Sequence, residues 1–329
     1  MTRPQTVPTL PTEFGYKPLM RALRNHLSGL RIPAALTLTL LALACQRGKR
    51  GNDGTPDTGS APVADPVGSA EAMRQKTELL PPPEVQQASN NPQKLPVYSG
   101  PTGTVRGVVR AGGDPAPSTA RDLADMKGDC PQARATFGYL FREGSERRLA
   151  DVLVAVTGYS GYVPAKGDTV TVFGEGCAWN KRTIVMTFGQ KLSVVAKDRR
   201  PYVPDLMGQK AVAQLFVMPG ADPVVLVPRH PGRFLLIDSM RLFNRAEVFA
   251  LTYPTAQVTG IDGGFEIQGI PVGKAKVSAF LPQTNAVIER EVEVVAGQPV
   301  NLDLQLPFDA QQYEQQRAIQ SFAHDSELL

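Results

Sequence analysis

Alternating hydrophobic and polar residues dominate the chain after residue 100. The stretch "VNLDLQL" (300–306) shows the pattern most clearly, because one valine and three leucines alternate with polar residues. Successive side chains of a strand point to opposite faces, so one face of this stretch is predicted to be buried and the other wet. Similar short runs, bounded by Gly, Pro and Asp, recur without a long helical pattern between them. The sequence therefore predicts an all-β fold made of antiparallel sandwiches.

The pattern also predicts where the elements lie. Strands are expected at 104–110, 151–158, 168–174, 183–189, 191–197, 211–218, 223–228, 234–238, 246–252, 265–269, 275–281, 290–295 and 300–306. Residues 308–329 are polar, and Asp309 is a suitable N-cap for a helix. We expect this last segment to be a polar tail or a short C-terminal helix.

The first 44 residues are predicted to be an export signal. The basic stretch "MRALRNHLSGLR" precedes an apolar run from Ile32 to Leu43, and Ala44 precedes Cys45. Such a run is too short to cross a bilayer, which needs about 20 apolar residues. Residues 1–44 are therefore expected to be a signal peptide whose true start is Met20, rather than a permanent membrane helix.

Charge gives no reason to expect a nucleic-acid partner. The chain has 35 basic and 31 acidic residues, and five of the basic and one of the acidic residues precede Cys45. The remainder is balanced, whereas binding to the phosphate backbone needs an excess of Lys and Arg.

The stretch "LALAC" (41–45) resembles the lipobox of bacterial lipoproteins. The resemblance implies that Cys45 is diacylated and becomes the mature N-terminus, and several acyl chains anchor a protein firmly to a membrane. Gln46 in place of an aspartate implies the outer membrane, facing the periplasm or the cell surface. The alternative is an ordinary secretory leader with an incidental cysteine. Residues 45–99 are rich in Pro, Gly, Ser, Asp and Gln and are expected to be a disordered tether.

Export also bears on the other two cysteines. An oxidising compartment favours pairing, and acylation of Cys45 leaves only Cys130 and Cys177 to pair. We expect a disulfide between them, with two buried free thiols as the alternative.

The stretch "VTGIDGGFEIQGIPVGKAKVSAFLP" (258–282) combines hairpin-turn glycines with alternating apolar residues. It resembles the signature of carboxypeptidase regulatory-like domains, and "GTVRGVVRAGGDPAP" resembles the opening strand of that family. The resemblance covers residues 256–306 and implies a transthyretin-like β-sandwich that acts as a structural or adhesive accessory without catalysis.

Residues 150–254 resemble the cupredoxin-like segment that accompanies such domains in exported bacterial proteins, on the stretches "ADVLVAVTG", "GEGCAWN" and "TFGQKLSVVAKDRRPYVPDLM". A blue-copper site needs a thiolate and two imidazoles. Aligned with the family pattern, the ligand positions fall on Ser239, Leu242 and Arg245, and only His230 and His324 follow Cys45. We therefore expect no metal and no other cofactor.

These resemblances divide the chain after the tether. Residues 100–254 are expected to form the cupredoxin-like sandwich, residues 255–307 the carboxypeptidase regulatory-like sandwich, and residues 308–329 the tail. The first strand of the 100–254 segment could belong to the carboxypeptidase regulatory-like sandwich instead, in which case the cupredoxin-like part is an insertion. Whether the two sandwiches share one domain stays open.

Six arginines of the cupredoxin-like segment lie in predicted loops. If those loops meet at one end of the sandwich, their guanidinium groups could clamp a carboxylate or phosphate group. The alternative is a set of solvated loop charges. The arginines are Arg199, Arg200, Arg229, Arg233, Arg241 and Arg245.

The expected function is non-enzymatic. No G-x-S-x-G, H-E-x-x-H or paired C-x-x-C motif occurs, so no catalytic residue is predicted. We expect a lipid-anchored cell-envelope protein, a structural or binding β-sandwich that has lost a cupredoxin-type metal site and that contacts an envelope protein or a surface glycan. One alternative is metal handling or electron transfer with atypical ligands. Another is a carbohydrate-binding module with an aromatic platform of Tyr159, Tyr162, Trp179 and Tyr202.

Overall fold

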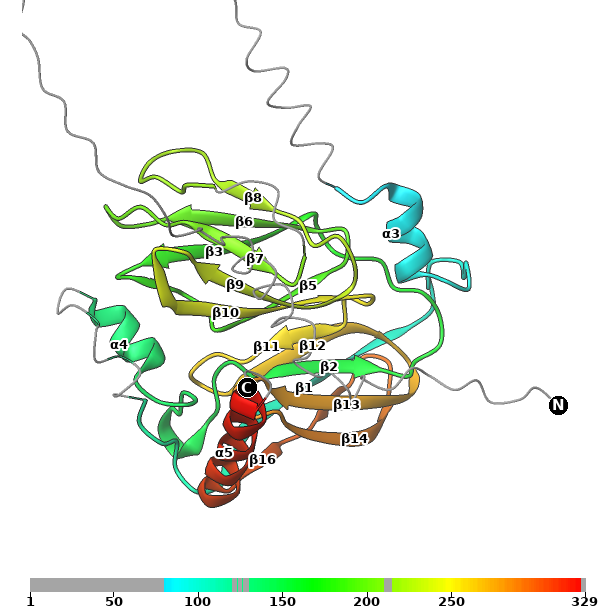
Figure 1. Ribbon diagram of the computed structural model, residues 1–329. Coiled ribbons are helices and arrows are strands. Elements are labelled where there is room, and N and C mark those ends of the chain that lie inside the picture. The colour runs from blue at the N-terminus through cyan, green and yellow to red at the C-terminus, as the bar shows by residue number, and fades with distance from the viewer. Residues whose placement is uncertain (1–79, 120–122, 124–125, 127–129, 210–214, 327–329) are drawn as a thin grey trace, which may run out of the picture. The chain divides into compact units, whose positions relative to one another are not determined.

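The computed structural model describes residues 80–119, 123, 126, 130–209 and 215–326, with side chains up to residue 318. These residues lie within one compact unit, 75–329, and most of its regular structure is β-sheet, which confirms the predicted all-β class (Figure 1). The predicted leader, Cys45 and most of the predicted tether lie outside the described residues. No described helix has the length and apolar character needed to span a membrane.

The first sandwich packs two four-stranded sheets around a core that includes Val105, Val154, Ile270, Val277 and Leu306. One sheet has the order β12-β1-β15, with β16 also paired to β1, and the other has the order β11-β2-β13-β14. The strands are β1 (Thr102–Gly113), β2 (Leu153–Thr157), β11 (Ala256–Val258), β12 (Gly264–Pro271), β13 (Gly273–Leu281), β14 (Ala286–Val294), β15 (Pro299–Asn301) and β16 (Leu304–Phe308).

The second sandwich has the sheets β4-β3-β6-β8 and β5-β10-β9-β7. Its core includes Val172, Leu192, Val194, Leu236 and Val248. The strands are β3 (Thr169–Glu175), β4 (Ala178–Trp179), β5 (Thr183–Thr187), β6 (Lys191–Ala196), β7 (Pro204–Met207), β8 (Val224–Leu226), β9 (Gly232–Asp238) and β10 (Arg241–Leu251). Most pairs in both sandwiches are antiparallel, but β1 with β15 and β16, β3 with β6, and β5 with β10 run parallel.

The second sandwich is inserted into the first (Figure 1). Strands β1 and β2 precede the insertion and pair with β12, and with β11 and β13, which follow it. The sheets therefore divide the chain between β2 and β3 and between β10 and β11. The second division falls at the expected boundary after residue 254, whereas the first falls after β2 rather than at residue 100. The strand 151–158, which sequence patterns placed in the second sandwich, lies in the first.

Residues 80–99 are ordered against the second sandwich, although the expected tether extends to residue 99. Helix α3 (Pro83–Asn90) begins with a proline in its first turn, and the Asn90 side chain donates to the carbonyl oxygen of Phe188 at 2.8 Å. Val97 forms a bridge with Tyr162. Long-range backbone and side-chain contacts thus override a composition that is typical of a flexible linker.

Three short helical segments complete the fold. Helix α4 (Pro131–Phe137) and the 3-10 turn η1 (Ser145–Arg147) lie in the connection between β1 and β2. Helix α5 (Ala310–Ser326) forms in the predicted C-terminal segment. Asp309 caps it as expected, because its Oδ1 accepts a hydrogen bond of 2.8 Å from the backbone N–H of Gln312.

Candidate functional site

The segment between β6 and β7 crosses one end of the second sandwich and carries Tyr202. The backbone of Tyr202 bridges Val217, and the backbone N–H of Ser239 donates to the carbonyl of Val203 at 2.8 Å. The Tyr202 side chain is fully buried, with its ring centroid 5.3 Å from that of Trp179. This arrangement places three chain segments side by side at this end of the sandwich.

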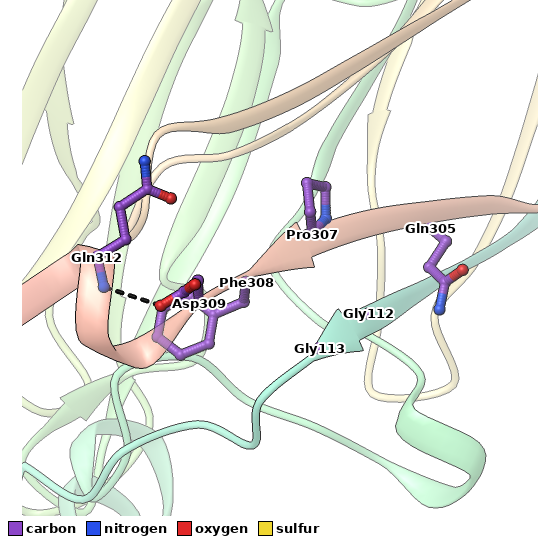
Figure 2. A pocket seen from close by; sticks show the side chains of 7 residues that line it. All are labelled: Gly112, Gly113, Gln305, Pro307, Phe308, Asp309 and Gln312. Atoms are coloured by element: carbon purple, nitrogen blue, oxygen red, sulfur yellow. Dashed lines mark hydrogen bonds between the residues drawn. The ribbon is translucent and has the colours of Figure 1, made fainter.

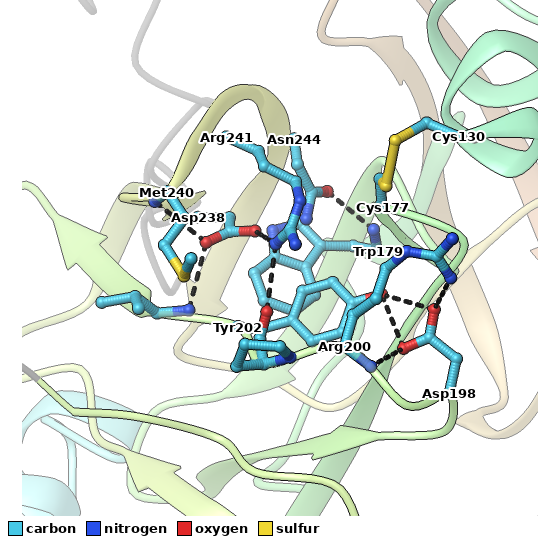
Figure 3. Close-up of polar contacts among 12 residues, drawn as sticks. Cys130, Cys177, Trp179, Asp198, Arg200, Tyr202, Asp238, Met240, Arg241 and Asn244 are labelled. Carbon is cyan, nitrogen blue, oxygen red and sulfur yellow. Dashed lines mark hydrogen bonds and ion pairs between the residues drawn. A yellow bond between two sulfur atoms is a disulfide. The ribbon is translucent and has the colours of Figure 1, made fainter. Parts of the chain in front are cut away.

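Two arginine–aspartate pairs flank Tyr202, as Figure 3 shows. Arg241 Nη1 lies 2.9 Å from Asp238 Oδ2, and its guanidinium carbon lies 5.2 Å from the centre of the Tyr202 ring. Asp238 is fully buried, and its Oδ1 also accepts backbone N–H bonds from Val203 and Met240, each at 3.1 Å. This carboxylate therefore joins the β9–β10 turn to the 201–203 segment.

The second pair joins Arg200 Nη1 to Asp198 Oδ2 at 2.9 Å. Burial alone would raise the pKa of Asp198, but hydrogen bonds from the backbone of Gly176 and from Arg200 lower it below its usual value. Burial, followed by the charge of Asp198, raises the pKa of the Tyr202 hydroxyl far above its usual value. An ionised carboxylate and a permanently protonated phenol suit a fixed hydrogen-bond network rather than proton transfer.

The six predicted anion-binding arginines do not meet at one end. Arg199, Arg200 and Arg241 lie near Tyr202, whereas Arg229 and Arg233 lie at the opposite end of β9. Asp238 is five residues after Arg233 on this strand, so the two are about 17 Å apart. The prediction that these loops converge is wrong because it did not include the strand direction.

Arg233 is part of the contact between the two sandwiches. It forms two hydrogen bonds with Glu247, at 2.8 and 3.0 Å, and also reaches Asn285 and the carbonyl of Pro282 beyond β13. Its guanidinium carbon lies 5.7 Å from the ring centre of Phe249, a residue that packs edge-on against Phe280. Arg233 is thus already bound within the molecule and is not available to an external anion.

The other arginines differ in their environment. Arg199, Arg229 and Arg245 are exposed, and none of them forms an ion pair with a described acidic residue. Arg245 lies on β10, where its charge helps to lower the pKa of the half-buried Arg182, after the larger effects of burial and of Arg142. Of the six predicted arginines, Arg199 is the one that has no described carboxylate partner and stands within three residues of Tyr202 in the chain.

The positions expected from the copper-protein pattern hold no suitable donor set. Ser239 is exposed in the β9–β10 turn, Leu242 is 69% exposed, and Arg245 points its charge to solvent. Aliphatic and guanidinium groups do not ligate copper. Across the residues that the structure describes, no group of three or more His, Cys, Asp or Glu side chains could hold a metal ion. His230 lies at the far end of β9, where its ring packs 4.8 Å from that of Phe234.

Cys130 and Cys177 form a disulfide, with their Cα atoms 5.4 Å apart, which confirms the predicted pairing. Gly176 and Cys177 both have positive φ, 54° and 67°, as a tight turn between β3 and β4 requires. The bond fastens the connection that contains α4 to this turn (Figure 3).

The aromatic platform of the carbohydrate-binding alternative does not form, because two of its four residues are buried. Trp179 and Tyr202 are each 0% exposed, so neither can stack on a sugar. Sequence patterns could not show this, because aromatic residues are common both in cores and at binding surfaces.

Sequence reasoning missed an exposed apolar group at the Tyr202 end. Phe216 and Met218, 58% and 49% exposed, flank Val217; Met240 and Leu242, 54% and 69% exposed, lie in or beside the β9–β10 turn. The two pairs lie on either side of the 201–203 segment, which bonds Val217 on one side and Ser239 on the other. The backbones that carry the two pairs are therefore two strand spacings, or about 10 Å, apart. We call these four residues the apolar rim. The only signal was strong hydrophobicity in "LFVM" and "SMRLF", which sequence analysis assigned to strands or ligand positions.

Two clefts open on the surface of the described residues. The first, of about 380 Å³, lies between the end of β1, the end of β16 and the start of α5, as Figure 2 shows. Glycine backbone and the Pro307 and Phe308 side chains form much of its wall, and Asp309 already bonds the backbone of Gln312. This cleft therefore offers no free charged group. The second cleft, of about 490 Å³, lies on the first sandwich.

Comparisons with known proteins give only distant structural likenesses. No family model matches the sequence, and a search of curated proteins finds no match. Amicyanin from Paracoccus versutus is 14% identical, with a TM-score of 0.23, over 30% of this chain and 96% of that one. A Cu-containing nitrite reductase (NirK) from Thermus scotoductus SA-01 is 11% identical, with a TM-score of 0.22, over 29% of this chain and 25% of that one. Likeness at this level carries no inference about activity.

Proposed function

We propose that this chain is a lipid-anchored, non-enzymatic protein of the bacterial cell envelope that binds another envelope protein through the apolar rim. Support for the anchor comes from the "LALAC" stretch and the composition of the segment after it. Support for binding comes from the apolar rim. Support for a non-enzymatic role comes from the Tyr202 network, whose charged groups are all bound to one another.

The exposed apolar rim is the observation that carries the proposal. These Phe, Met and Leu side chains are about half or more exposed at one end of a sandwich, and burying their apolar surface in an interface would lower the free energy. Met, Phe and Arg are enriched in protein interfaces, and Arg241 stands between the rim residues Met240 and Leu242 in the chain. The Arg241–Asp238 pair below it holds the β9–β10 turn in a fixed position, so less ordering is needed on binding.

The test compares complexes of the full-length chain extracted from envelopes in detergent. Wild-type chain is expected to elute in a complex larger than itself, and Phe216→Glu with Leu242→Glu is expected to elute alone. Val287→Glu, on the exposed edge strand β14, is the matched control, because Val287 is 50% exposed but lies on the other sandwich. Loss of the complex in the control as well, or its persistence in the double variant, contradicts the proposal. A complex that contains only copies of this chain contradicts it too.

A further inference from the structure

The second cleft lies on the outer face of the sheet β12-β1-β15. Its floor includes two cross-strand rows that the strand register sets side by side, one of Gln268, Thr104 and Pro299 and the other of Glu266 and Arg106. Asn301 continues the second row just beyond the lining. Neighbouring strands lie about 4.8 Å apart and alternate residues about 7 Å apart, so the floor measures about 10 by 7 Å. This area matches one or two sugar rings better than a folded protein surface.

Lys166 forms one wall of the cleft. It lies in the connection between β2 of the first sandwich and β3 of the second. The side-chain amide of Gln190 donates to the Lys166 backbone carbonyl at 3.2 Å, which fixes this loop. A Cβ atom on Gly269 would lie 3.7 Å from Lys166 Nζ, so the ammonium group lies close to the backbone of β12. Gln298, in the turn before β15, forms another part of the lining.

Two cations in this cleft lack a carboxylate partner. Arg106 donates through Nε to Asn301 Oδ1 at 2.9 Å, while its cross-strand neighbour Glu266 accepts from Gln268 instead. Among the described residues, neither Arg106 nor Lys166 forms an ion pair. A planar guanidinium with free N–H groups and a nearby ammonium favour an anionic ligand group such as a carboxylate.

Apart from the Glu266 carboxylate, which accepts from Gln268, the other hydrogen-bonding side chains of the lining are uncharged. The amides of Gln268 and Gln298 and the hydroxyl of Thr104 can each donate and accept, as sugar hydroxyls do. Together with the two cations, they fit a ligand that carries both hydroxyl and acid groups. No aromatic side chain lines the cleft, so recognition depends on charge and hydrogen bonds rather than stacking.

We propose that this cleft binds an acidic oligosaccharide, with the carboxylate of a uronic acid between Arg106 and Lys166 and its hydroxyl groups on the neighbouring amides. The site is separate from the apolar rim and goes beyond the proposed function. A protein with both would connect an envelope protein to an acidic glycan.

The test measures binding of tetragalacturonate to the full-length chain in detergent by calorimetry. Lys166→Glu and Arg106→Gln are each expected to weaken binding about tenfold or more, which corresponds to loss of one charge-assisted contact. Lys274→Glu, an exposed lysine on β13, is expected to bind like wild type. A neutral galactose tetramer and inorganic phosphate are both expected to bind much more weakly than tetragalacturonate.

Several results would overturn the assignment. These are no binding of tetragalacturonate by wild type, equal binding of the neutral tetramer or of phosphate, or unchanged binding by both cleft variants. Leu242→Glu is included to separate the two proposals, because it should lose the protein complex and keep glycan binding. Thermal unfolding of each variant checks that it is folded, and Lys166, which is exposed and lies outside the strands, can be replaced without disturbing a sheet.

Discussion

Replacing Arg241 by methionine tests whether the arginines near Tyr202 are structural. Methionine keeps an apolar stem against the Tyr202 ring but removes the partner of Asp238, whose side chain is fully buried. Removing one partner of a buried ion pair costs about 3–5 kcal/mol, because the other charge is left uncompensated. Two backbone N–H groups still bind Asp238, so we expect the lower end, about 3 kcal/mol. This is a large share of the typical total stability of about 5–15 kcal/mol.

The measurement is urea unfolding of protein produced without its leader. Arg245→Met is the matched control, since Arg245 is exposed and has no ion pair with a described residue; its cost should stay within about 0.5 kcal/mol. Adding Asp238→Asn to Arg241→Met should recover part of the loss, because the amide oxygen can still accept both backbone bonds without a charge. A cost below about 1 kcal/mol for Arg241→Met, or equal costs for the two arginine variants, would refute this reasoning.

Further predictions concern the disulfide, pH, metal and anchor. Replacing Cys130 and Cys177 by alanine should lower stability by about 4 kcal/mol on the chain-entropy model, since the bond closes a loop of 47 residues; unfolding in urea measures it. Burial raises the pKa of Tyr253 to about 12, so the folded state keeps a proton that the unfolded state loses near pH 10. Stability should therefore be complete below pH 10 and fall between about pH 10 and 12, with a smaller fall in Tyr253→Phe. Metal analysis and a visible spectrum after copper addition should show no stoichiometric blue centre. Cys45→Ser should move the chain from the membrane fraction to the soluble fraction or leave its leader uncleaved, as fractionation and mass spectrometry of the N-terminus will show.

Alternation along the chain was enough to predict the fold class and most strand positions, because burial of one sheet face repeats every second residue. It was less successful at strand ends. The expected strand 300–306 is interrupted in the structure, where β15 ends at Asn301 and β16 begins at Leu304. Leu302 N–H bonds the carbonyl of Arg106, and Asp303 accepts from the backbone of Val108. These contacts come from residues about 195 positions away and leave no local pattern.

The candidate sites show a similar division. The disulfide could be predicted because the expected export of the chain favours pairing, and the expected acylation of Cys45 leaves one possible pair. The positions of the six arginines could not be predicted, because they depend on which end of β9 each loop joins. The partners Asp198 and Asp238 lie only two and three residues from Arg200 and Arg241, yet the same spacing occurs on solvated loops. Only burial of Asp238 distinguishes a structural pair from surface charges.

Photocrosslinking in living cells tests the central claim most directly. A photoreactive amino acid is placed at Leu242 of the full-length chain and, as a control, at Ile261, which is 56% exposed on the other sandwich. The account predicts one envelope protein crosslinked from position 242 and absent from position 261. No crosslinked product from 242, or the same product from both positions, would contradict it.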